Sequence, residues 1–88
     1  MSEFDKLQDE SLENIAGGDE RTVNNETSGF AYIREEPFLN SRIISKAYNG
    51  QFVYTTGKTE SNDGYVWYQI NLHGEYSHGW IMGQLIGY

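Results

Sequence analysis

Short segments rich in aromatic and β-branched residues, separated by turn residues, fill the chain from Gly29 onward. The pattern predicts strands at residues 30–34, 42–47, 52–58, 65–72 and 77–82, with turns at 35–41, 48–51, 59–64 and 73–76. After residue 18, the sequence indicates helix only as a single turn near residues 83–85. About five short strands with tight turns in about 60 residues indicate an all-β fold, as a small barrel or closed sandwich.

In the segment 65–72 apolar and polar side chains alternate, with one exception at Trp67. The face expected to point inward carries Val66, Tyr68, Ile70 and Leu72. Trp67 lies on the other, polar face. If residues 73–76 form a hairpin loop, Trp80 is its diagonal neighbour there and Met82 lies directly opposite. Two interpretations stay open: the two tryptophans form an exposed platform for peptide or sugar, or a loop covers them as a second small core.

The remaining strands give a core and a further outward aromatic residue. Ile33 and Ile44 are expected inside with Tyr68, Ile70 and Ile81. Tyr32 and Arg34 alternate with that inner set, so both are expected to face outward, with Tyr32 bordering the surface of Trp67. The segment 52–55 is ambiguous, because either Val53 and Thr55 or Phe52 and Tyr54 can point inward.

The first eighteen residues have a different pattern. The large apolar side chains fall within one arc of about 140° on a helix, and they are Phe4, Leu7, Leu12 and Ile15. Gly17 and Gly18 follow and end the helix. The segment is therefore expected to be a short acidic amphipathic helix, marginal or disordered in isolation, that leads into a dipeptide without side chains. Such a dipeptide suits a peptidase with a narrow active site.

Charge and composition exclude several classes of function. The formal charge is −7, and residues 19–88 hold eight acidic and five basic residues. A nucleic-acid partner is therefore not expected, since phosphate binding needs a basic surface. No apolar run reaches the roughly 18 residues of a membrane span, so membrane insertion is not expected either. Without cysteine there is no disulfide framework and no zinc ribbon.

The sequence offers little for catalysis. His73, Glu75 and His78 are close together, but a hairpin would spread them over opposite strands, so they are interpreted as polar loop residues rather than metal ligands. No nucleophile elbow and no glycine-rich phosphate loop is present. We therefore expect no enzyme activity, no catalytic residue, no metal and no cofactor.

The N-terminal segment resembles the double-glycine leaders of bacteriocins and peptide pheromones, which place large apolar residues where Phe4, Leu7, Leu12 and Ile15 stand. One departure is Ser11, where an acidic residue is usual; Glu10 precedes it. The resemblance implies cleavage after the pair Gly17-Gly18 by a peptidase-containing ABC transporter. It also implies a cytoplasmic precursor and a secreted or cell-surface product. The alternative is an ordinary N-terminal helix that ends at a glycine cap.

From Gly29 to Ile86 the order of motifs resembles the bacterial SH3 (SH3b) family. The matching motifs are the run from Ile33-Arg34 through Pro37 to Ile43-Ile44, then Asn49-Gly50-Gln51, Trp67-Tyr68-Gln69-Ile70, and Gly79-Trp80-Ile81. The resemblance implies a small SH3-like barrel at residues 29–88. The segment 19–28 is polar with one aliphatic residue, so it is expected to be a flexible linker between the barrel and the leader at 1–18.

Modules of this family often target cell-wall hydrolases or bind peptidoglycan. The leading hypothesis is an exported binding protein that recognises a peptide or the peptide stem of the cell wall, through Tyr32, Trp67 and Trp80. One alternative is a bacteriocin-like secreted effector or signal. Another is a cytoplasmic SH3-like interaction module whose N-terminal helix only looks like a leader.

Overall fold

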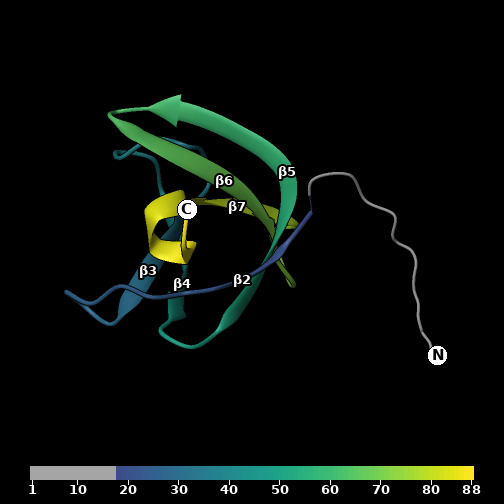
Figure 1. Ribbon diagram of the computed structural model, residues 1–88. Coiled ribbons are helices and arrows are strands. Elements are labelled where there is room, and N and C mark those ends of the chain that lie inside the picture. Colours follow the sequence, from purple (N-terminus) through teal and green to yellow (C-terminus); the bar gives the residue numbers. More distant parts are fainter. Residues whose placement is uncertain (1–17) are drawn as a thin grey trace.

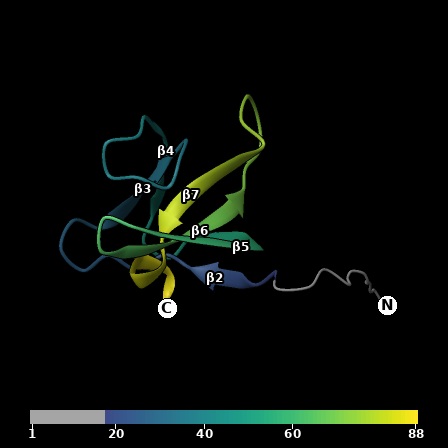
Figure 2. The same ribbon diagram turned by 90° about the horizontal axis from the view of Figure 1, so that it is seen from above.

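The computed structural model describes residues 18–88. The elements, in chain order, are β2 (Glu20–Thr22), β3 (Phe30–Arg34), β4 (Ile43–Tyr48), β5 (Phe52–Asn62), β6 (Tyr65–Asn71), β7 (His78–Met82) and the 3₁₀ helix η1 (Gly83–Ile86). The six strands form one antiparallel sheet in the order β2-β5-β6-β7-β3-β4, curled into a half-barrel (Figure 1). Seen from above, β2 and β4 lie at opposite ends of this sheet (Figure 2). In this part of the chain, no helix is long and apolar enough to cross a membrane.

The predicted all-β class is confirmed, and β3 has its predicted bounds. The expected loop at 59–64 is wrong, because β5 continues to Asn62 and a two-residue turn follows. Asp63 and Gly64 in that turn have φ angles of 59° and 81°. Positive φ at both central residues gives a hairpin turn whose twist matches that of the flanking strands. The strand can therefore run to its full eleven residues before the chain reverses.

The segment 19–28, expected to be a flexible polar linker, contains strand β2. Its residues Glu20–Thr22 pair antiparallel with Tyr54, Val53 and Phe52 of β5. The next residue, Val23, is only 1% exposed and belongs to the core. The structure corrects the expectation here: backbone pairing to β5 and one buried valine hold a segment whose other side chains are mostly polar.

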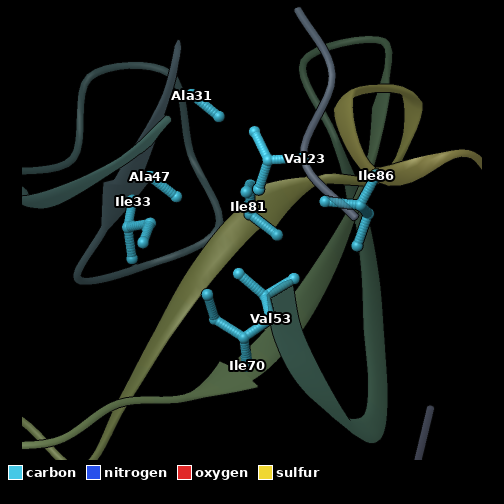
Figure 3. Packing of buried hydrophobic residues seen from close by; sticks show 8 residues of the cluster. All are labelled: Val23, Ala31, Ile33, Ala47, Val53, Ile70, Ile81 and Ile86. Carbon is cyan, nitrogen blue, oxygen red and sulfur yellow. The ribbon is translucent and has the colours of Figure 1, made fainter. Parts of the chain in front are cut away.

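A cluster of eight buried residues forms the core: Val23, Ala31, Ile33, Ala47, Val53, Ile70, Ile81 and Ile86. In Figure 3 the residues of β3 and β4 face those of β5 and β6, with Ile81 between them. Ile44 and Tyr68 are partly buried against this cluster, so the predicted inner face is confirmed. Val53 and Thr55 are the inward pair of β5, which resolves the ambiguity at residues 52–55.

The predicted register of the β6–β7 hairpin is also confirmed. Trp67 pairs with Met82, Tyr68 with Ile81, and Gln69 with Trp80. The prediction that Val66 belongs to the core is wrong, because its side chain is 48% exposed. It lies beside the turn at the tip of the β5–β6 hairpin, beyond the residues that pack against the core cluster.

Candidate ligand-binding groove

A hollow of about 440 Å³ lies along the outer side of β3, and we call it the β3 groove. Its apolar and aromatic lining comes from Phe30, Tyr32, Trp67, Met82 and Leu85. The neutral polar lining comes from Asn25, Thr27, Ser28 and Gln84. Arg34 is the only charged residue of this lining. An apolar hollow with a few convergent polar groups is the usual form of a ligand site.

Strand β3 supplies one wall, because its alternate residues Phe30, Tyr32 and Arg34 point to the same side of the sheet. The rings of Phe30 and Tyr32 meet edge to face, with centroids 5.1 Å apart. Tyr32 is 41% exposed, as its outward position predicts. It offers the groove an open ring with a polar hydroxyl.

The register between β3 and β4 shifts at Arg34: Ile33 pairs with Ser45, Arg34 pairs with Ile43, and Ile44 of β4 is left without a pair. The Arg34 guanidinium here lies 5.8 Å from the Tyr32 ring, and its Nη1 donates to the Ser41 carbonyl at 3.0 Å. Lys46 of β4 pairs with Tyr32 of β3, and its Nζ lies 4.8 Å from the Phe30 ring. Arg34 and Lys46 therefore lie beside the aromatic rings of Tyr32 and Phe30.

The opposite wall is a turn that sequence reasoning missed, and Asn25 holds it in place. Its Oδ1 accepts from the Thr27 amide at 3.1 Å, and its Nδ2 donates to the Phe30 carbonyl at 2.9 Å. Its own carbonyl accepts from the Gly29 amide at 2.8 Å. Asparagine is typical of such turns because its side chain bonds the local backbone. The pattern Asn-x-Thr-x-Gly was the available signal, in a segment interpreted as a linker.

Trp67 lies on the face that the alternation predicts, but its side chain is only 1% exposed. Its Nε1 donates to the Asn62 carbonyl at 3.1 Å, and the Tyr65 ring lies edge-on at 6.3 Å. It is absent from the eight-residue core cluster. The exposed platform is therefore corrected in favour of the covered alternative. The Trp67 side chain still lines the β3 groove as part of its floor.

Trp80 is also buried, with 7% of its surface exposed. Its strand, β7, lies between β6 and β3, and Trp80 pairs with Gln69 on one side and Arg34 on the other. A residue in this central position is enclosed by neighbouring side chains from both strands. Trp80 is not among the residues that line the groove. The structure thus brings Tyr32 and Trp67 to one groove and leaves Trp80 outside it.

Other sequence predictions lie outside the described residues or outside the groove. The leader positions Phe4, Leu7, Leu12, Ile15 and Gly17 fall in residues 1–17, outside the part of the chain that the structure describes. Among residues 18–88, no group of three or more histidine, cysteine or acidic side chains is placed to hold a metal ion.

A family model of the bacterial SH3 domain matches residues 29–86, which is most of the chain and nearly all of the sheet. The chain belongs to the bacterial SH3 family. This SH3 domain extends beyond the matched segment, since β2 and the turn at Asn25 precede it. One wall of the β3 groove therefore comes from residues outside the family match.

The chain is also similar to serine/threonine-protein kinase D of Synechocystis sp., with 28% identity over 74 residues. The similar stretch covers 84% of this chain and 14% of the kinase, so the chain spans a small part of that relative's length. A comparison with solved structures gives no significant match.

Proposed function

We propose that this SH3 domain binds a peptide, or the peptide stem of peptidoglycan, in the β3 groove. The observation that carries the proposal is the exposed ring of Tyr32 beside an apolar floor, in a family of binding domains. Aromatic residues with one apolar and one polar end are enriched at binding surfaces.

The three residues proposed from the sequence have different parts in this function. Tyr32 contacts the ligand directly through its exposed ring. Trp67 is only 1% exposed and packs beneath the groove. Because its Nε1 already donates to Asn62, it contributes packing rather than a hydrogen bond. Trp80 acts only indirectly, through the position of Arg34, with which it pairs.

The test replaces Tyr32 with alanine and uses two probes, sedimented purified peptidoglycan and a synthetic stem pentapeptide. We expect Tyr32→Ala to weaken pentapeptide binding by about 2 kcal/mol, roughly 30-fold, which is the scale of an interface hot spot. The matched control is Tyr54→Ala, since Tyr54 is 51% exposed and lies outside the groove. Equal binding by the two variants, or binding to neither probe by the wild type, contradicts the proposal.

We further propose that the domain is exported after a peptidase-containing ABC transporter cleaves the bond between Gly18 and Asp19. The support is the resemblance of residues 4–18 to double-glycine leaders, together with the bonds that Asp19 makes to the sheet. The Asp19 amide donates to Thr55 Oγ1 at 2.8 Å, and its carbonyl accepts from the Thr55 amide at 2.8 Å. Cleavage at this bond therefore leaves every strand of the described sheet in the product.

Mass spectrometry of the cell-free and cell-associated protein tests the export. We expect an N-terminus at Asp19 outside the cell, and accumulation of the uncleaved chain when Gly18 is replaced by valine. Thr59→Val is the control, because it introduces valine at an exposed strand position distant from the cleavage bond. A chain that keeps residues 1–18 and stays in the cell favours the cytoplasmic interaction module instead. Killing or signalling by the exported product would favour an effector.

A further inference from the structure

The charge of the β3 groove is opposite to that of the protein. The chain has a net charge of −7, yet the groove lining holds one cation, Arg34, and no carboxylate. Lys46 adds a second cation beside it, with its Nζ 4.8 Å from the Phe30 ring and 5.9 Å from the Tyr32 ring. A local positive site in an acidic protein favours an anionic group on the ligand.

The Arg34 guanidinium is bonded on one side only. Its Nη1 donates to the Ser41 carbonyl, whereas its Nε is buried and has no hydrogen-bond partner among the described residues. A buried donor without an acceptor costs free energy in the unliganded protein. The contact with Ser41 also fixes the plane of the guanidinium. Nη2 is then the guanidinium nitrogen that is neither bonded to Ser41 nor buried without a partner.

The accessible nitrogen indicates which ligand group fits. Nη2–H is a donor of a charged guanidinium, and its strongest hydrogen bond is to an anionic oxygen such as that of a carboxylate. Tyr32 lies next to the guanidinium, at 5.8 Å, and supplies an apolar ring for the atoms adjoining the carboxylate. Regular alternation along β3 puts Arg34 on the same side as Tyr32, and the Ser41 carbonyl then holds one end of its guanidinium.

We propose that Arg34 is the specificity residue of the groove and binds a carboxylate of the peptide ligand through its Nη2. This inference rests on the proposed peptide-binding function and names the ligand chemistry that the groove selects. The carboxylate belongs either to the free end of the peptide or to an acidic residue within it. Both sources present the same two oxygens to Arg34.

The experiment compares three synthetic stem pentapeptides by calorimetry: one with all its carboxylates free, one amidated at its C-terminus, and one amidated at its internal glutamate. Wild-type protein is expected to bind one of the two amidated peptides about tenfold or more weakly than the free peptide. The amide that loses affinity identifies the source of the carboxylate. Equal affinity for all three peptides overturns the inference and leaves the proposed function intact. No binding to any of them overturns both.

Arg34→Gln is expected to bind the free peptide and the discriminated amide equally. Arg42→Gln is the matched control, because Arg42 is exposed and does not line the groove, and it should keep the full discrimination. The ratio of the two affinities within one variant is insensitive to a partial loss of folded protein. If Arg34→Gln does not fold, the ¹⁵N NMR signal of Arg34 Nη2–H in the wild type decides. It should shift with the free peptide and not with the discriminated amide, and an unmoved signal contradicts the inference.

Discussion

Trp67 owes its burial to contacts made by the tip of the β5–β6 hairpin and by β7. Asn62 accepts the indole N–H, Tyr65 packs edge-on against the ring, and Met82 lies opposite on β7. The indole N–H therefore has a partner, and its burial carries little penalty. The residue anchors a small second core on the groove side of the sheet.

Replacing Trp67 with alanine is expected to lower the free energy of unfolding by about 3–5 kcal/mol, because a large buried side chain leaves a cavity. That is a large part of the roughly 5–15 kcal/mol that stabilises a domain. Urea unfolding followed by circular dichroism measures it. Phe52→Ala is the control, since Phe52 is 59% exposed and should change stability by about 0.5 kcal/mol or less. A Trp67→Ala variant with wild-type stability would show that the indole is not packed as described.

At the scale of residues, alternation along β6 predicts correctly which side of the strand Trp67 occupies. It does not predict burial, because the covering residues Asn62 and Tyr65 act through the geometry of the hairpin. Arg34 was placed on the outer face for the same reason as Tyr32, but its role was not foreseen. Its contact with Ser41 arises only when β3 pairs with β4 and brings the end of the connecting loop beside it.

Among the elements, the β5–β6 hairpin organises the side of the domain that carries the groove. Its tip is bonded to the loop between β3 and β4: Asn62 Nδ2 donates to the Pro37 carbonyl at 3.1 Å, and the Leu39 amide donates to Asp63 Oδ2 at 2.9 Å. The same loop contains Ser41, which holds the Arg34 guanidinium. The turn at Asp63 and Gly64 thus supports a loop that reaches the candidate site.

Gly64→Ala should therefore destabilise the domain through the backbone alone. A Cβ at this position meets no atom within 4 Å, whereas the φ of 81° is unfavourable for any residue with a Cβ. The expected cost is about 1–2 kcal/mol, seen as a lower midpoint in thermal or urea unfolding. Asp63→Asn is the control and should be nearly neutral, because asparagine tolerates positive φ and keeps a side-chain oxygen for the Leu39 amide. An equal loss in both variants would point to the Leu39 contact rather than the turn.

The elements that the sequence predicted well are those with strong alternation or paired aliphatic residues, such as β3 and β7. Strand β2 was missed because it is only three residues long and its side chains are polar. Its existence depends on pairing with the first half of β5, which no local pattern announces. The end of β5 was missed because Asn62 and Asp63 are typical loop residues, although the Asp-Gly pair was a signal for a tight turn.

At the scale of the whole molecule, contacts join the region of strand β2 to Tyr88. The Tyr88 ring stacks on Tyr68 with centroids 4.2 Å apart and an interplanar angle of 4°. The Arg21 guanidinium lies 4.2 Å from the same ring, and Tyr88 Oη donates to Asp19 Oδ2 at 2.9 Å. Gly83 leaves room for the stack, since a Cβ there would lie 2.5 Å from Tyr68. The described chain is thus closed between Asp19 and Tyr88, around the edge that β2 provides.

This closure makes the stability of the domain depend on pH in the alkaline range. Partial burial, and then the hydrogen bond to the Asp19 carboxylate, raise the pKa of Tyr88 above its ordinary value of 10.0. The folded state therefore favours the neutral phenol. The resulting stability is fully present below about pH 10, where the unfolded tyrosine is also neutral, and it is lost as the pH rises through the folded pKa.

We expect the thermal midpoint of the wild type to fall as the pH is raised from about 9 to about 11, and the fall to be smaller in Tyr88→Phe. Phenylalanine keeps the stack on Tyr68 and the contact with Arg21 but has no hydroxyl to ionise. Tyr54→Phe is the control: Tyr54 is 51% exposed, and this variant should retain the wild-type pH profile. Identical profiles for the wild type and Tyr88→Phe would mean that the bond between Asp19 and Tyr88 does not hold the two ends together. Strand β2 would then be held by its pairing with β5, by the buried Val23 and by the hydrogen bonds of Arg21 to the Ile86 and Gly87 carbonyls.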